Sequence, residues 1–272
     1  DRPEILETDL SRFAFDLAEW GVASPDNLAF LDQPGEGHFL AAKARLQALK
    51  LLDMGGRITE LGKRIQNLPL DPHLGVMALQ AERHGPKKLR SALILAALLT
   101  DGLFRNEVDL RSLYTHTIRS PQGSVKQTFE RLCRWFSISS KGDFCPRDEI
   151  GEFLLSAYPH WIAKNQGGGR FQLVAGQRVL CPTEIELSSE KYLVVADLMG
   201  EAANLRLLAA CPLDASTFED HAAHHATTEE RMFFDEIEGR VKAETITTLG
   251  ALLLEKKVIL LLRHLWFLLK MI

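Results

Sequence analysis

Apolar residues recur every three or four positions through the first 165 residues, which is the spacing of one face of an α-helix. The first two stripes are Leu6, Leu10, Phe13, Leu17 and Trp20, then Phe39, Ala42, Leu46 and Leu49. A glycine turn at residues 53–56 and a short extended segment follow, and Thr59 can cap a helix from Leu61 to Asn67. This order of elements predicts a winged-helix domain over residues 1–70.

A second helical region is predicted to begin at Asp71, a suitable N-cap residue before Pro72 at the first helical position. The segment Ser91–Leu99 is apolar on nearly every side, so we expect its helix to lie at the centre of a bundle. Further stripes are Val125, Phe129, Leu132 and Phe136, then Ile150, Phe153, Leu154 and Ala157. Residues 71–160 are therefore predicted to form a helical bundle.

The hydrophobic period changes from 3.6 to two after the glycines at 167–169, which indicates strands. The expected strands are Arg170–Ala175, Arg178–Cys181, Tyr192–Leu198, Asn204–Ala210, Met232–Ile237 and Arg240–Thr245. Short strands at this spacing are typical of a small closed β-barrel of the OB type. The predicted fold class is multidomain, α then β: a winged helix plus a helical bundle, followed by a small OB-like β-barrel over residues 165–255.

Composition narrows the class of protein without naming a function. The chain of 272 residues is 46% apolar and 25% charged, with a net charge of −4, so it is neither disordered nor a uniformly basic nucleic-acid binder. Its four cysteines contain no CxxC pair, which argues against a zinc ribbon or a disulfide framework. We expect a cytoplasmic location, where thiols stay reduced, and nothing near the start resembles a signal peptide.

The last segment, residues 256–272, has a different character from the rest. Its apolar run Val258–Ile272 is interrupted by Arg263, His264 and Lys270, and it is shorter than the about 20 residues that a membrane span needs. We therefore predict no membrane association. We expect this tail to pack as a makeshift helix or to lie disordered, without completing a further domain.

Sequence motifs for phosphate binding and hydrolysis are missing. The chain has no GxxxxGK[ST], no GxGxxG that opens a helix, no HExxH and no GxSxG. We therefore predict no catalytic residues in this chain.

Three groups of motifs carry a family resemblance. The stretch at 48–62, ALKLLDMGGRITELG, and the LPLDP at 68–72 resemble the signature that follows the motor domains of DEAH-box RNA helicases. The AYP at 157–159, the GRF at 169–171 and the GQR at 176–178 are similar to the entry of that family's OB-fold. The ACPLD at 210–214 is most similar to the HrpB-type bacterial branch.

The resemblance implies the C-terminal region of an ATP-dependent RNA helicase. In that family the winged-helix, ratchet and OB parts line a channel for single-stranded RNA, while two RecA-like motor domains bind ATP and Mg²⁺. The implied partners are thus single-stranded RNA and N-terminal motor domains, with no cofactor bound by this chain. The likeness ends near Leu254–Glu255, and a reading-frame change or an artificial end would each explain the remainder.

Charge distribution supports an RNA-binding surface. Residues 153–183 contain no Asp or Glu but include Lys164, Arg170 and Arg178, which we predict to bind RNA phosphates. Residues 111–141 carry six basic residues against Glu130 alone, whereas residues 214–244 hold nine acids and three bases. An ordinary solvated surface is the alternative.

Aromatic residues near this segment have competing interpretations. Phe171 and Tyr192 could stack on bases, although Phe171 alternates with Leu173 and is predicted to lie in the barrel core. Trp161 is interpreted as an interdomain wedge, and Cys133 as a buried small hydrophobe.

A histidine cluster near Asp220 also has two interpretations. His221 and His225 would share one face of a helix, with His224 between them. Such spacing is compatible with zinc, but it places no third ligand, so we predict no metal site.

Two other classes of function stay open. A stand-alone winged-helix regulator would need a basic recognition helix, and the segment Glu60–Asn67 offers only Lys63 and Arg64. A protein-interaction scaffold could use the acidic region at 214–244 as a docking face.

Overall fold

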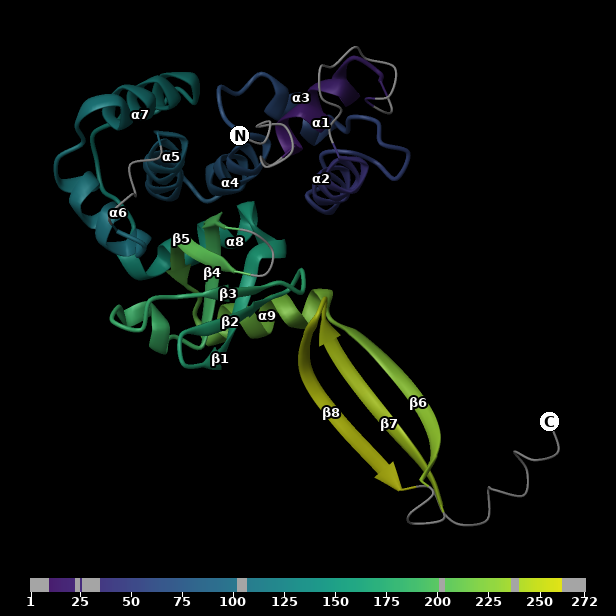
Figure 1. Cartoon of the computed structure of the whole chain (residues 1–272). Coiled ribbons are helices and arrows are strands. Elements are labelled where there is room, and N and C mark those ends of the chain that lie inside the picture. Colours follow the sequence, from purple (N-terminus) through teal and green to yellow (C-terminus); the bar gives the residue numbers. More distant parts are fainter. Residues whose placement is uncertain are drawn as a thin grey trace. The chain divides into compact units, whose positions relative to one another are not determined.

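The computed structural model describes residues 10–22, 25, 35–101, 107–200, 204–235 and 240–260. The chain divides into two compact units (Figure 1). The first comprises residues 1–159 together with 208–211, and the second comprises residues 160–207 and 212–272. Each unit is described separately below.

The first unit is helical. Its helices are α1 (Ser11–Glu19), α2 (Glu36–Ala48), α3 (Glu60–Gln66), α4 (Pro72–Glu82), α5 (Pro86–Asp101), α6 (Leu110–Arg119), α7 (Gly123–Trp135) and α8 (Ile150–Ala157). The predicted stripe of α2 is confirmed, because Phe39, Ala42, Leu46 and Leu49 are all buried. The part of the α1 stripe that precedes Leu10 lies outside the described residues.

The turn between α2 and α3 is closed by a short backbone pairing. Leu52 and Ile58 form an isolated antiparallel bridge, and the Asp53 N–H donates to the Arg57 carbonyl at 2.8 Å. The predicted cap of α3 is confirmed, since Thr59 Oγ1 accepts the Gly62 N–H at 3.1 Å. A side-chain oxygen in this position satisfies a backbone donor that the first helical turn leaves unpaired.

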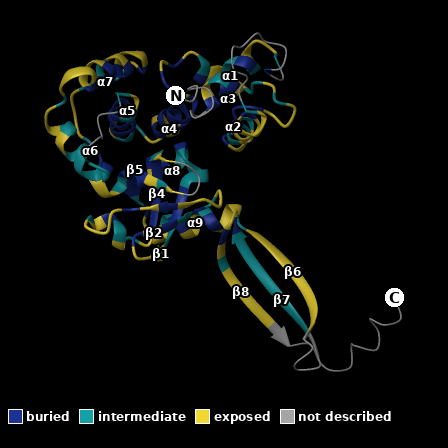
Figure 2. Cartoon of the chain, in the orientation of Figure 1, coloured by how far each residue is buried: buried dark blue, intermediate teal, exposed yellow. Residues whose placement is uncertain are grey.

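Helix α5 forms the core of the segment from α4 to α8. Every residue from Leu89 to Leu98 is buried, as the sequence predicted for the central helix (Figure 2). Its polar Ser91 is satisfied inside the core, because the Cys145 N–H donates to Ser91 Oγ at 2.8 Å. The Tyr114 hydroxyl lies 3.1 Å from Ser91 Oγ and donates to the Cys145 carbonyl at 2.9 Å.

A buried arginine of α5 binds the loop between α7 and α8. Arg90 is only 7% exposed, and its guanidinium donates through Nε to the Ser139 carbonyl at 3.0 Å and through Nη1 to the Asp143 carbonyl at 2.8 Å. Gly142 lies directly against the guanidinium, with a φ of +140°. A side chain at position 142 would collide with Arg90, so this glycine permits the close approach.

A closed five-stranded barrel follows the helices, and all of its residues belong to the second unit except 208–211 of its last strand. Its strands are β1 (Ile162–Gly167), β2 (Arg170–Leu173), β3 (Arg178–Leu180), β4 (Tyr192–Met199) and β5 (Leu205–Pro212). They are hydrogen-bonded in the order β1-β2-β3-β5-β4, with β3 and β5 parallel. The predicted order of helices first and a closed barrel later is therefore confirmed, with β1 as an additional strand.

The last predicted hairpin does not belong to the barrel. Strands β6 (Thr227–Asp235), β7 (Arg240–Leu249) and β8 (Leu252–Leu260) form a separate three-stranded antiparallel sheet after helix α9 (Ala215–His225). The expectation that the tail is a makeshift helix or is disordered is wrong for residues 258–260, which form strand pairs with β7. The rest of the tail lies outside the described residues.

The turn between β7 and β8 contacts the barrel. The Ala251 N–H donates to the Val174 carbonyl at 2.8 Å, and Leu252 is fully buried. Gly250 has a φ of +53° and lies so close to Val174 that a Cβ would clash with its carbonyl oxygen. Away from this turn, the described side chains of β6 and β8 are largely exposed (Figure 2).

Candidate nucleic-acid interface

Alternation along the barrel strands separates an apolar interior from a basic exterior. In β2, Phe171 and Leu173 are buried while Arg170 is exposed. In β3, Val179 is buried between the exposed Arg178 and Leu180. Because successive side chains of a strand point to opposite faces, the arginines are placed outside the barrel by the same pattern that fills its core.

The strand register places these residues in two adjacent rows. Lys164 of β1 pairs with Gln172 of β2, which pairs with Arg178 of β3. Arg170 pairs with Leu180, which in turn pairs with Arg206 of β5 in the parallel ladder. The first row is thus Lys164, Gln172 and Arg178, and the second row is Arg170, Leu180 and Arg206. Directly paired side chains lie about 5 Å apart across a sheet. We call these six residues the barrel basic face.

The four cations of this face differ in their protein contacts. In the described part of the chain none of them pairs with an Asp or Glu. Arg170 Nε donates to the Gly167 carbonyl of its own hairpin at 3.3 Å, and Lys164 Nζ donates to the Leu253 carbonyl at 3.1 Å. Among the described residues, Arg178 and Arg206 have no hydrogen-bond partner, which leaves both guanidiniums available to an external anion.

Three of these cations were predicted from the sequence, and the fourth was not. Arg170, Arg178 and Lys164 all lie on the barrel basic face, and their role in RNA binding stays a prediction. Arg206 lies about 30 residues further along the chain and reaches the face through the parallel pairing of β3 with β5. No local pattern around residue 206 signals this pairing.

The aromatic candidates for base stacking lie inside the fold. Phe171 is fully buried, as its alternation predicted. Tyr192 is 6% exposed, and its ring stacks on Phe218 of α9 with centroids 3.7 Å apart. Neither ring is accessible to a nucleotide base. Trp161 is half-buried with its ring 5.4 Å from that of His160, and its interpretation as a wedge stays a prediction.

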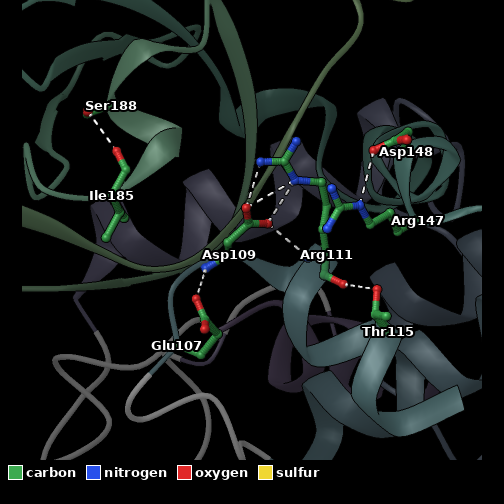
Figure 3. A network of polar contacts seen from close by, with 8 residues as sticks. All are labelled: Glu107, Asp109, Arg111, Thr115, Arg147, Asp148, Ile185 and Ser188. Carbon is green, nitrogen blue, oxygen red and sulfur yellow. Dashed lines mark hydrogen bonds and ion pairs between the residues drawn. The ribbon is translucent and has the colours of Figure 1, made fainter. Parts of the chain in front are cut away.

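A second basic segment lies in the helical unit. Arg111 is occupied by a bidentate ion pair with Asp109, in which Nη2 lies 2.7 Å from Oδ2 and both side chains are under 15% exposed (Figure 3). Asp109 also caps α6 by accepting the Arg111 N–H at 2.9 Å. On α7, by contrast, Arg131 and Arg134 are exposed beside Trp135, which is 44% exposed.

The cysteines are unsuited to chemistry. Cys133, Cys145, Cys181 and Cys211 are all buried, and none of them forms a disulfide. Burial raises the pKa of Cys133 and of Cys181 to about 11, so both thiols stay protonated near neutral pH. Cys133 is thus the buried small hydrophobe that its neighbours in α7 predicted.

The described residues show neither a cluster of metal ligands nor a membrane-spanning helix. They contain no group of three or more His, Cys, Asp or Glu side chains arranged to hold a metal ion. No helix among them combines the length and the apolar character needed to cross a bilayer.

The described chain thus combines a helical unit with a five-stranded barrel that carries basic residues on its outer face. Over 253 residues the chain is 27% identical to the ATP-dependent RNA helicase HrpB of Escherichia coli K12. The matched region is 92% of this chain and 30% of the relative. The chain is therefore homologous to part of HrpB, as the motifs indicated. No family model matches the chain.

Two solved structures share this fold. The crystal structure of the E. coli DExH-box NTPase HrpB matches with a TM-score of 0.79 and 27% identity over 96% of this chain. The crystal structure of the E. coli DEAH/RHA helicase HrpB matches with a TM-score of 0.78 and 25% identity over 94% of this chain. The present chain spans 31% of each of these structures, so it corresponds to about a third of its relatives.

Proposed function

We propose that this chain is an accessory region of an ATP-dependent RNA helicase and binds the backbone of single-stranded RNA through the barrel basic face. The homology to HrpB supports the class of protein, and the unpaired guanidiniums of Arg178 and Arg206 support the surface. ATP and Mg²⁺ would be bound by RecA-like motor domains, which are the expected partners. By itself the chain would not hydrolyse ATP, because phosphoryl transfer needs a phosphate cradle and bound Mg²⁺.

The proposal extends to the architecture. The strand order β1-β2-β3-β5-β4 with parallel β3 and β5 supports an OB-type barrel, a fold that binds oligonucleotides on its outer strands. Helices α1–α3 with the bridge between Leu52 and Ile58 support a winged-helix-like module. The four buried cysteines, none of which forms a disulfide, support a cytoplasmic location.

Phosphate contacts give the proposal a measurable salt dependence. Each phosphate that a cation neutralises on a single strand contributes about 0.7 to the slope of log affinity against log salt. Substituting Arg178→Glu together with Arg206→Glu should therefore lower the slope by about 1.4 and weaken binding to all RNA sequences alike. The measurement is a salt titration of the affinity for a fluorescent single-stranded RNA.

A matched control comes from the same unit. Arg231 is also an exposed strand arginine, but its Nη2 lies 3.0 Å from Oε2 of Glu229, so its charge is already paired. Arg231→Glu should leave the RNA affinity and the salt slope unchanged. Equal losses in Arg231→Glu and in the double variant would show a general charge effect and would remove the barrel basic face from the proposal.

The alternative of a stand-alone winged-helix regulator loses support from α3. Its two cations are paired with acids, Lys63 with Glu60 at 2.6 Å and Arg64 with Glu82 at 3.1 Å. A recognition helix with neutralised cations has little to offer DNA.

One specific observation supports the alternative function of a protein-interaction scaffold. Met232, Phe233 and Phe234 are between 41% and 66% exposed on β6, within the acidic region at 214–244. Two results together would favour this function instead. RNA binding would be the same in all variants, and the chain would capture a protein partner that Phe233→Ser no longer binds.

A further inference from the structure

Helix α9 is held on the barrel in a fixed rotation. Its Phe218 is buried and stacks on Tyr192 of β4 with an interplanar angle of 11°, and Ala222 lies on the same buried stripe. The stripe one residue earlier along the helix is formed by Thr217, His221 and His225, which are half-buried or exposed. The packing of Phe218 therefore places both histidines at the margin of the helix, accessible to solvent.

The two imidazoles lie against each other. Their ring centroids are 4.4 Å apart with an interplanar angle of 33°, as expected for side chains four residues apart on a helix. Within the described chain no residue hydrogen-bonds to either ring. The neighbouring His224 differs, because its Nδ1 lies 2.7 Å from the Asp220 carbonyl oxygen and is thereby occupied.

This separation matches the geometry of a chelate. With a metal–nitrogen bond of about 2.0 Å, the metal lies about 3.2 Å from each ring centroid. Two such rings have centroids about 4.5 Å apart at an angle of about 90°, as in square-planar or octahedral coordination, and about 5.2 Å apart at the tetrahedral angle. The observed 4.4 Å is close to the first value, so the spacing of the rings suits a shared ion of that geometry.

We propose that His221 and His225 form a two-histidine binding site for an imidazole-preferring divalent transition metal such as Zn²⁺, Ni²⁺ or Cu²⁺. Since the described residues contain no set of three ligands, water completes the coordination and the ion exchanges readily. Affinity should follow the general order for nitrogen ligands, with Cu²⁺ bound most tightly. This site is independent of the proposed RNA binding, and it revises the sequence-based expectation of no metal, which rested on spacing alone.

Calorimetric titration of the full chain, without an affinity tag, with NiCl₂ and with ZnCl₂ tests the site. The wild-type chain should bind one ion through this pair. His225→Ala should weaken metal binding at least about tenfold. Removing a residue that only hydrogen-bonds to a metal ligand already costs about 10- to 100-fold in affinity, and this variant removes a ligand itself. His225 is exposed, so this variant should keep its fold, which the far-UV circular dichroism verifies. His224→Ala is the matched control and should bind like the wild type.

A relocated pair provides a second, positive test. Thr217 is half-buried, four residues before His221 on the same stripe. Thr217→His added to His225→Ala therefore creates a new pair with the same spacing and should restore binding. Any of three results would overturn the proposal. His225→Ala could bind metal as tightly as the wild type, or His224→Ala could weaken binding as much as His225→Ala. The third is a folded double variant that does not regain binding.

Discussion

Replacing Arg90 by Met should destabilise the helical unit by about 3 kcal/mol. The guanidinium makes two short hydrogen bonds to loop carbonyls, of Ser139 and of Asp143, and a hydrogen bond from a charged donor contributes about 1.5–3 kcal/mol. Losing both hydrogen bonds would cost about 3–6 kcal/mol. Part of this cost is offset, because the neutral Met side chain avoids the desolvation of a guanidinium that is only 7% exposed in the folded chain. The midpoint of thermal unfolding should fall by about 6–12 °C for a unit of this size.

Urea unfolding followed at 222 nm provides the measurement, since the described helices lie mostly in the first unit. A double-variant cycle with Gly142→Ala makes the test specific. The added methyl carbon would lie 2.8 Å from Arg90 Cζ, so Arg90→Met should relieve part of the cost of Gly142→Ala. A loss below about 1 kcal/mol for Arg90→Met, or strictly additive effects, would refute the role assigned to this arginine.

Two further predictions concern the second unit. Burial lowers the pKa of His221 from 6.5 to about 4, so between these pH values the unfolded chain binds a proton that the folded chain does not. Stability should therefore fall as the pH drops from 6.5 to 4, by about 1 kcal/mol after allowance for the partial exposure of the side chain. In urea unfolding, the difference between wild type and His221→Gln should change over this range and become independent of pH above about 7. Gly250→Ala should loosen the turn from β7 to β8, because the new methyl group would clash with the Val174 carbonyl oxygen. Amide hydrogen exchange at Ala251, whose N–H donates to that carbonyl, should be faster in the variant, and an unchanged exchange rate would contradict the prediction.

The sequence predicted the helices well because each signals itself locally. Apolar stripes four and three residues apart define α2 and α7, and an all-round apolar segment marks α5. Thr59 marks the start of α3 with its own side chain. These signals depend on neighbours within one or two turns, so no knowledge of the rest of the fold is needed.

The β structure was harder to predict because its pattern depends on distant partners. Strand β1 reads IAKNQG, with two buried residues followed by four that are half-buried or exposed, so it lacks the alternation that marks a strand. The hairpin of β6 and β7 showed the right period, yet the period does not say which sheet a strand joins. Its addition to β8 rather than to the barrel is decided by pairing between residues 240–249 and 252–260.

Pairing of charges separates the candidate binding surface from ordinary surface better than net charge does. On the three-stranded sheet the cations lie beside acids: Arg231 near Glu229 at 3.0 Å, Lys256 near Glu244 at 2.7 Å and Lys257 near Glu255 at 2.8 Å. On the barrel basic face, the described residues offer no acid to any of the four cations. None of the four cations is directly paired with another, but Arg170 and Arg178 are diagonal neighbours across β2 and β3, and like charges on one face repel one another. An external polyanion would relieve that repulsion, and the acids of the β6–β8 sheet already do so for its own cations. A chain with a net charge of −4 can therefore still present a surface suited to RNA phosphates.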